Sequence, residues 1–260
     1  MKTLNYNVPS EWNNNNIISS FLGSGFLVID QPFIDMKESL ISFKEKLKIE
    51  LNELEETEEG YNFLLSNKCN DAGDNDFGVF KIILKNCDII RQRFLKIGCE
   101  ILYTIEEFLD VPSNSITMKH ADSDNALRFI KYYKEQKGPI RIGEHCDFGT
   151  LTLVHVCDPV EEYEIFYDDS WKKIKHPSDD FLIVNIGDFM QIWSDNKLKS
   201  TPHRIMNKTK KERHSMVMFM DAGNHIINGI DHATWNKDRI KKAHSGMTYY
   251  HKKSEMHFPG

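Results

Sequence analysis

The chain has 260 residues, of which 40% are hydrophobic and 28% are charged, and its formal net charge is −6 at pH 7. These values are typical of an ordinary globular protein that is long enough to bury a sizeable core. The acidic balance argues against nucleic acid as a partner, and no apolar run approaches the roughly 20 residues that cross a bilayer.

The N-terminal residues hold no apolar stretch with a cleavage site, so we expect no secretory signal and a cytoplasmic protein. The five cysteines are an odd number without a CxxC pair, which fits reduced thiols in that compartment. A basic cluster at Lys208–Arg213 is interpreted as a solvated turn. We expect no nucleic-acid or membrane partner, and the sequence is compatible with a monomer.

The first part of the chain, residues 1–112, is predicted to be mainly helical. Its Asn-rich opening is interpreted as a loose arm, and the apolar run Gly25–Val28 is predicted to be a strand. Apolar residues then recur at helical spacing from Leu40 to Leu54 and again from Asp88 to Leu109. Two amphipathic helices are therefore expected, each with one face against a core.

A polar, acid-rich stretch at Asn67–Gly78 resembles a calcium-binding loop at first sight. That interpretation fails, because the twelfth position counted from Asp74 is Lys85, where such a loop needs a bidentate Glu. We predict instead a surface loop near a substrate entrance.

The second part, residues 113–260, is predicted to hold a β-rich core and a C-terminal segment within the same single domain, residues 1–260. Short apolar runs alternate with turns, which indicates a sandwich or barrel with the earlier helices packed outside it. Asn185–Asp188 predicts a tight turn that leads into a short helix through Trp193. The predicted strands are Leu127–Tyr133, Thr150–Val156, Glu164–Phe166, Phe181–Asn185, Arg204–Met206 and Ser215–Met220.

Two side chains in the stretch Gly143–Thr152 indicate a metal site. His145 and Asp147 are two residues apart, and side chains at that spacing in an extended strand point to one face. A neutral imidazole and a carboxylate suit a divalent metal, and His203 would complete the two-histidine, one-carboxylate arrangement of non-haem iron(II) sites. Zinc is the main alternative. The nearby Glu144 is expected on the opposite face, where it could not serve as the base of a zinc hydrolase.

Arg213 and Ser215 show the same spacing of two residues within a β-rich run. A guanidinium and a hydroxyl on one face would bind a buried carboxylate through directional hydrogen bonds. Val217 and Phe219 are expected on this inner face as well. The residues expected on the outer face are His214, Met216, Met218 and Met220.

The same counting places Lys131 on one face with Phe129 and Tyr133. Two interpretations of Lys131 stay open. It enters the barrel and binds an acidic group of a substrate, or it lies solvated at the rim.

Six short blocks follow one another in the second part: His145-Cys-Asp147, Gly149-Thr-Leu-Thr152, Trp171-Lys-Lys-Ile-Lys-His-Pro177, Asn185-Ile-Gly-Asp188, Ser200-Thr-Pro-His-Arg204 and Arg213-His-Ser215. Their order and content resemble the isopenicillin N synthase-like iron(II)/2-oxoglutarate-dependent oxygenases, which carry an H-x-D pair, an N-I-G-D turn, a distal histidine block and an R-x-S pair. The resemblance covers roughly Leu127 to Asp221 and is loose elsewhere.

The resemblance implies a mainly β fold with flanking helices, built on a double-stranded β-helix of the jelly-roll, cupin-like type. It implies a catalytic iron(II) ion held by His145, Asp147 and His203, with O2 and 2-oxoglutarate as co-substrates. The distal carboxylate of 2-oxoglutarate would lie against Arg213 and Ser215.

A tyrosine of that family also touches the co-substrate. Tyr133 matches it best, and a slip of one residue to Tyr132 stays open. Lys131 stands where many plant members have Asn, which changes a polar contact near the iron. Cys146 replaces a more usual residue and should point away from the metal, and the presence of Asp147 disfavours the carboxylate-free site of related halogenases.

The implied function is oxidation, foremost hydroxylation, of an unactivated C–H bond in a small-molecule substrate, with release of succinate and CO2. Two alternatives stay open, because fold alone does not decide between them. One is an iron-dependent oxidase of the same fold that cyclises or desaturates its substrate without 2-oxoglutarate, and the other is a non-catalytic metal-binding module. The substrate pocket is expected where the N-terminal part and the loops meet the barrel.

Overall fold

Short strands and a few long helices make up the computed structural model, which describes residues 3–55, 79–84, 89–121, 125–133, 138–158, 162–175, 178–209, 211–223, 226–227 and 230–231. Its elements in chain order are β1 (Thr3–Asn5), α1 (Asn14–Ser24), β2 (Phe26–Asp30), the 3-10 helix η1 (Ile34–Met36), α2 (Lys37–Glu55), β3 (Val79–Leu84), α4 (Ile89–Leu109), α5 (Thr117–Ala121), β4 (Ala126–Tyr132), β5 (Ile140–His145), β6 (Leu151–Val156), β7 (Tyr163–Tyr167), β8 (Ser170–Lys173), β9 (Phe181–Ile186), α6 (Asp188–Trp193), β10 (His203–Met206), β11 (Arg213–Met220), β12 (Ile226–Ile227) and β13 (Ile230–Asp231).

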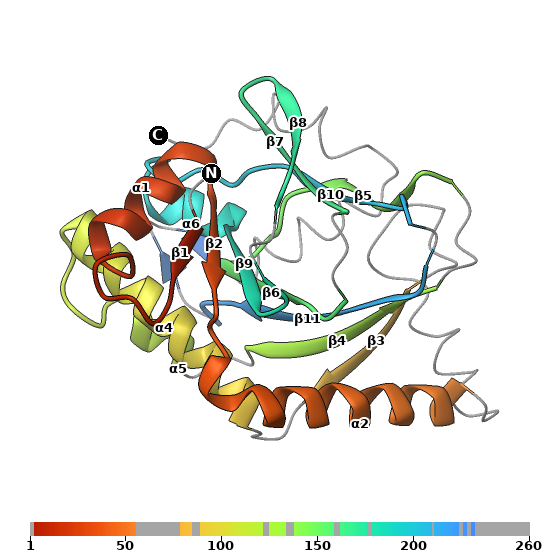
Figure 1. Ribbon diagram of the computed structural model, residues 1–260. Coiled ribbons are helices and arrows are strands. Elements are labelled where there is room, and N and C mark those ends of the chain that lie inside the picture. The colour runs from red at the N-terminus through yellow and green to blue at the C-terminus, as the bar shows by residue number, and fades with distance from the viewer. Residues whose placement is uncertain are drawn as a thin grey trace.

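Two sheets face each other, and the helices lie on the outer side of the larger one (Figure 1). The larger sheet has seven strands in the order β1-β2-β9-β6-β11-β4-β3, and the smaller has four in the order β5-β10-β7-β8. Most sheet neighbours are not neighbours in sequence, as expected where a chain crosses repeatedly between two sheets. The predicted mainly β, jelly-roll fold with flanking helices is confirmed.

The six strands predicted in the second part are present as β4, β6, β7, β9, β10 and β11. The strands β1, β3 and β8 were not predicted, and each of them lies at the edge of its sheet. The edge strands β1 (TLN) and β8 (SWKK) carry few apolar residues and gave no strand pattern, whereas β3 (VFKIIL) is apolar and was missed despite its pattern.

Alternation of side chains along the strands separates two apolar cores. The inner core fills the space between the sheets and joins residues such as Val154 and Ile183 of the larger sheet to Ile165 and Ile205 of the smaller one. The outer core lies between the larger sheet and the helices. Strand β11 contributes to both cores as predicted. Its inner-face residues are Val217 and Phe219, and its outer-face methionines are Met216, Met218 and Met220.

The two predicted amphipathic helices are confirmed as α2 and α4. Helix α4 buries Phe94, Ile97 and Ile101 in the outer core. It approaches the sheet closely at Gly98, where an added Cβ atom would lie 2.1 Å from the sulfur of Met220. A glycine at this position therefore lets a helix backbone lie directly on the methionine layer of β11.

The interpretation of the Asn-rich opening as a loose arm is wrong, because this segment forms β1 and α1. Asn13 caps α1, since its side chain accepts a hydrogen bond from the backbone N–H of Asn16 at 3.1 Å. Gly25 ends the helix in the left-handed conformation with φ of 72°. Ile17 and Phe21 are buried in the outer core. The asparagine before the helix and the glycine after it were the sequence signals for this helix.

Two predictions fall on residues outside those described above. One is the surface loop predicted at Asn67–Gly78. The other is the C-terminal segment, which lies outside the described residues from position 232 onward. Within the described part of the chain, no helix is both long and apolar enough to span a bilayer.

The predicted turn at Asn185–Asp188 brings two segments of backbone into contact. Gly187 donates its N–H to the carbonyl of Thr150 at 2.9 Å, and Asp188 donates to the carbonyl of Asp147 at 2.8 Å. A Cβ atom on Gly187 would lie 2.1 Å from the carbonyl oxygen of Gly149. Only glycine therefore fits this contact, which ties the end of β9 to the loop before β6.

We expect Gly187→Ala to lower the free energy of unfolding by about 3 kcal/mol, because two backbone segments would have to move apart. Chemical denaturation monitored by circular dichroism measures this change. Gly23→Ala is the matched control, since a Cβ atom there meets nothing within 4 Å. The control should be neutral or stabilise by about 0.5 kcal/mol as an exposed helix position. Equal effects of the two substitutions would contradict the close contact at Gly187.

Candidate metal centre

Three side chains converge between the two sheets at the positions that the sequence indicates. The Nε2 atom of His145 is 3.7 Å from Oδ1 of Asp147, and the Nε2 atom of His203 is 3.7 Å from Oδ2 of the same carboxylate. One ligand atom from each of the three lies within 4.8 Å of the others. Two nitrogens and one carboxylate oxygen at this separation fit a divalent ion of mixed nitrogen and oxygen preference.

The two histidines are held by strand pairing. His145 ends β5 and His203 begins β10, and the two residues lie opposite each other in the antiparallel pair. Asp147 lies beyond the end of β5 rather than within a strand, so the strand periodicity used in the prediction does not place it. Its position depends instead on the hydrogen bond between its backbone carbonyl and Asp188.

Both imidazoles turn the same nitrogen toward Asp147. The Nδ1 atom of His145 lies 2.8 Å from the carbonyl oxygen of Gly143, and that of His203 lies 3.2 Å from the carbonyl oxygen of Thr201. Since a carbonyl only accepts, Nδ1 carries the proton and Nε2 keeps a free lone pair. Burial, followed by the nearby His145, lowers the pKa of His203 to about 4, so this imidazole is neutral at pH 7.

Asp147 is oriented from the larger sheet. Asn185 donates its Nδ2–H to Oδ2 of Asp147 at 2.8 Å within the buried interior. Burial by itself would raise the pKa of Asp147, but His203 and His145, with hydrogen bonds from Thr152 and Asn185, outweigh it and lower the pKa. The sequence interpretation of Asn185 as a turn residue missed this contact. An amide at the end of the apolar run Phe181–Ile186 was the signal for it.

Two aromatic rings enclose His203. The ring of Tyr163 stacks on its imidazole with centroids 5.4 Å apart and an interplanar angle of 10°, and Phe26 approaches edge-on at 5.6 Å. Burial, followed by the charge of Asp147, raises the pKa of Tyr163 well above its usual value. Its phenol therefore stays protonated. Sequence reasoning did not identify Tyr163, because nothing in the sequence shows which residue of β7 faces β10.

A second polar group lies further along the interior. Arg213 is 1% exposed, and none of its three guanidinium nitrogens has a hydrogen-bond partner among the described residues. Its guanidinium lies 5.0 Å from the ring centroid of Tyr132, and Ser215 donates to the phenol oxygen of Tyr132 at 3.3 Å. A buried cation without an acceptor is costly, so the guanidinium of Arg213 suits an organic carboxylate as its partner.

The tyrosine beside Arg213 is Tyr132 and not the predicted Tyr133. Tyr132 lies opposite Arg213 in the pair of β4 with β11 and belongs to the inner core. Tyr133 packs on the outer core. The doublet made both assignments possible from sequence, and a shift of one residue moves a side chain to the other face of a sheet.

Lys131 does not enter the barrel. It lies on the outer face of β4, where its Nζ is 5.2 Å from the ring centroid of Tyr133 and 3.5 Å from Oε2 of Glu212. Both interpretations of Lys131 need correction, because the side chain is buried rather than solvated at the rim and faces away from the interior. Cys146 points away from the three converging side chains as expected, with its thiol 3.8 Å from the carbonyl oxygen of Ser200.

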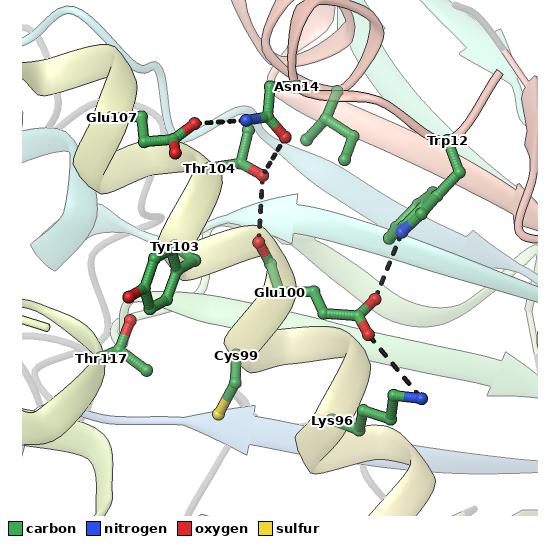
Figure 2. Close-up of a pocket in the computed structure, with 10 residues that line it drawn as sticks. Trp12, Asn14, Lys96, Cys99, Glu100, Tyr103, Thr104, Glu107 and Thr117 are labelled. Atoms are coloured by element: carbon green, nitrogen blue, oxygen red, sulfur yellow. Dashed lines mark hydrogen bonds and ion pairs between the residues drawn. The ribbon is translucent and has the colours of Figure 1, made fainter. Parts of the chain in front are cut away.

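A surface pocket of about 610 Å³ lies in the helical layer between α1 and α4, away from the inner core (Figure 2). Its charged groups pair with residues of the same pocket. Glu100 accepts a hydrogen bond from the ring N–H of Trp12 at 3.2 Å and lies 4.0 Å from Lys96, while Glu107 accepts from Asn14. The charged side chains of this pocket therefore already have partners within it, and none of its lining residues belongs to the metal centre.

Known proteins resemble this chain in both sequence and fold. Residues 121–222 match the model of the 2OG-Fe(II) oxygenase superfamily. The 2-oxoglutarate-dependent dioxygenase traH of Penicillium crustosum is 28% identical over 141 residues, which are 52% of this chain and 43% of that protein. The chain thus spans less than half the length of this curated relative.

Two solved structures share the fold. The dioxygenase for auxin oxidation 1 from Arabidopsis thaliana, in a binary complex with 2-oxoglutarate, has a TM-score of 0.64 at 17% identity, over 85% of this chain and 92% of that one. JOX2 in complex with 2OG, Fe and JA has a TM-score of 0.73 at 17% identity, over 99% of this chain and 89% of that one. At these identities the likeness concerns the fold.

A jelly roll with two histidines and an aspartate between its sheets defines the class of double-stranded β-helix proteins with an interior metal site. Within that class, residues 121–222 are the part of the chain that matches the model of the 2OG-Fe(II) oxygenase superfamily. The family resemblance inferred from the sequence is confirmed at this level.

We expect Asn185→Ala to weaken the binding of a divalent metal by about 10- to 100-fold, because Asp147 would lose the donor that orients it. Calorimetric titration with Co²⁺ measures this affinity. Asn207→Ala is the matched control, since Asn207 is also buried and its amide donates to the carbonyl of Gly138, which is not a residue of the metal centre. Equal affinities of the wild type and the Asn185 variant would contradict the role assigned to this amide.

Proposed function

We propose that this protein is an iron(II)- and 2-oxoglutarate-dependent oxygenase that oxidises a C–H bond of a small molecule. The observation that carries the proposal is the convergence of His145, Asp147 and His203 at a point reached from the barrel opening, where the His145 side chain is 35% exposed. Two imidazole nitrogens and one carboxylate fit iron(II), and three ligands on one face would leave further coordination positions for co-substrate and oxygen.

The buried guanidinium of Arg213 supports 2-oxoglutarate as the co-substrate. A dicarboxylate could bind metal through its 2-oxo acid end and place its other carboxylate against the guanidinium fork and the hydroxyl of Ser215. Such an anion would supply the acceptors that the three nitrogens of Arg213 need. Tyr132 and Tyr163 would line the space between, both kept protonated because burial raises the pKa of each.

The overall reaction balances as R–H, O2 and 2-oxoglutarate giving R–OH, succinate and CO2. Bound iron would supply the activation of oxygen. The side chains of the protein hold the reactants: the imidazoles and Asp147 fix the metal position, Arg213 orients the dicarboxylate, and the inner core excludes water from the reacting atoms.

We also propose that residues 1–260 act as one oxygenase domain. Phe21 and Phe94 of the N-terminal helices share the outer core with Leu153 and Met218 of the barrel, so the helical layer supports the sheet that carries the site. A cytoplasmic location, where thiols such as Cys99 stay reduced, and a small-molecule substrate belong to the same proposal.

Anaerobic titration of the protein with Fe²⁺ and 2-oxoglutarate should produce a weak visible charge-transfer band, because the 2-oxo acid would chelate the metal. His203→Ala should abolish the band, since one of the three ligands is lost. His155→Ala is the control histidine: it is buried on the outer side of β6, where its Nδ1 bonds the carbonyl of Phe181. A colourless complex of the wild type would sink the proposal. A band without succinate formation in a broad substrate screen would favour the oxidase alternative.

Arg213→Gln should raise the KM for 2-oxoglutarate by about 10- to 100-fold while leaving iron affinity unchanged, because only the distal carboxylate loses a charged partner. Succinate release at varied 2-oxoglutarate measures the effect. Arg93→Gln removes an arginine that pairs with Asp35 in the helical layer and should leave the KM unchanged. An unaltered KM in the Arg213 variant would show that the dicarboxylate lies elsewhere.

A further inference from the structure

The inner faces of β4 and β11 change from buried to accessible along their length. On β11, Arg213, Ser215 and Val217 are at most 5% exposed, whereas Phe219 is partly exposed. On β4 the same change occurs between Ile130, which is 4% exposed, and Arg128, which is partly exposed. Solvent therefore reaches the inner faces of these two strands at Arg128 and Phe219.

The register of the strands places this opening beside the metal centre. Phe219 of β11 pairs with Thr152 of β6, and Thr152 pairs with Asn185 of β9. The side chains of Thr152 and Asn185 both donate hydrogen bonds to the carboxylate of Asp147. Phe219 thus continues, on the inner face, the row of side chains that holds the carboxylate.

Arg128 reaches toward that same row. It lies opposite Val217, on the face that Ile130 and Tyr132 also occupy, and its guanidinium carbon is 4.8 Å from the ring centroid of Phe219. Two strand spacings separate β4 from β6, so the backbone of Arg128 lies about 10 Å across the sheet from β6, which carries Thr152. A cation held on an aromatic ring at this distance faces any molecule that enters toward the metal centre.

We propose that Arg128 binds the carboxylate of the substrate, so that the enzyme acts on a small organic acid; this inference rests on the oxygenase function proposed above. The acid group forms a bidentate pair with the guanidinium fork, which Phe219 orients by stacking. The rest of the substrate then lies along Phe219, Thr152 and Asn185. Its end away from the acid group presents a C–H bond to the metal centre.

The two arginines on the inner faces of β4 and β11 lie at different depths, and we assign them different ligands. Arg213 lies in the buried part of the barrel and suits the co-substrate, whereas Arg128 lies at the accessible end and suits the substrate. Among the described residues of the inner faces of β4 and β11, these two are the cations. Loss of Arg128 should therefore affect binding of the substrate and spare that of 2-oxoglutarate.

The test compares acids with amides of the same shape. Anaerobic calorimetry on the full chain, loaded with Fe²⁺ and saturating 2-oxoglutarate, measures the affinities of 3-phenylpropanoate and octanoate and of their primary amides. Saturating 2-oxoglutarate keeps the acids away from Arg213. We expect at least one acid to bind about 10-fold or more tightly than its amide, and Arg128→Gln to remove this difference.

Two further variants keep the result interpretable. Arg128→Met retains the aliphatic stem on Phe219 without the charge, and it should also remove the preference for acids if the Gln variant does not fold. Arg93→Gln, in the helical layer, should retain it. Acids that bind no better than amides, or a preference that survives both Arg128 substitutions, would overturn the inference.

The charge-transfer band separates this inference from the proposed function. A normal band in the wild type and in Arg128→Gln, without any preference for acids, contradicts the substrate class alone. A preference for acids that depends on Arg128, in a protein that gives no band, supports the carboxylate site and contradicts the oxygenase function.

Discussion

The hydrogen bond from Asn185 to Asp147 is the contact on which the metal centre depends most. The pairing of β5 with β10 already positions His145 and His203, because the two residues lie opposite each other in the smaller sheet. Asp147 lies past the end of β5, and its ionised form is costly to bury. Asn185 and Thr152 supply donors from the larger sheet, so the carboxylate is oriented only where the two sheets face each other. The site therefore exists as a property of the closed jelly roll and not of any single strand.

Three charged side chains lie at different positions along the strands β4 and β11 or beside them, and these positions indicate what each one can bind. Arg213 is buried at one end of β11, the carboxylate of Asp147 lies toward the other end, and Arg128 stands at the opening. Apolar side chains such as Val154 and Ile183 fill the intervening inner core. In such surroundings an unmatched charge is expensive. None of the guanidinium nitrogens of Arg213 has a hydrogen-bond partner among the described residues, and this is what supports the dicarboxylate co-substrate proposed above.

Sequence patterns predicted the residues that lie close together in the chain and failed where strand pairing decides. The spacing of His145 and Asp147 and the family blocks identified the three converging side chains, and alternation identified both faces of β11. The doublet Tyr132-Tyr133 could not be resolved, because either residue alternates correctly and only the register with Arg213 selects one. Tyr163 and Asn185 were missed because their partners lie tens of residues away. The N-terminal helix was missed because Asn-rich composition outweighed the capping signals at Asn13 and Gly25.

The methionines of β11 all face the helical layer. Met216, Met218 and Met220 are buried in the outer core, while the inner face of the same strand carries a guanidinium, a hydroxyl, Val217 and Phe219. Thioethers are among the side chains most readily damaged by reactive oxygen species, and their oxidation turns a flexible apolar group into a polar one. A full thickness of β-sheet separates these sulfur atoms from the compartment in which oxygen chemistry would occur. The alternation that builds the two cores therefore also places the methionines beneath α4, on the far side of the sheet from the proposed oxygen chemistry.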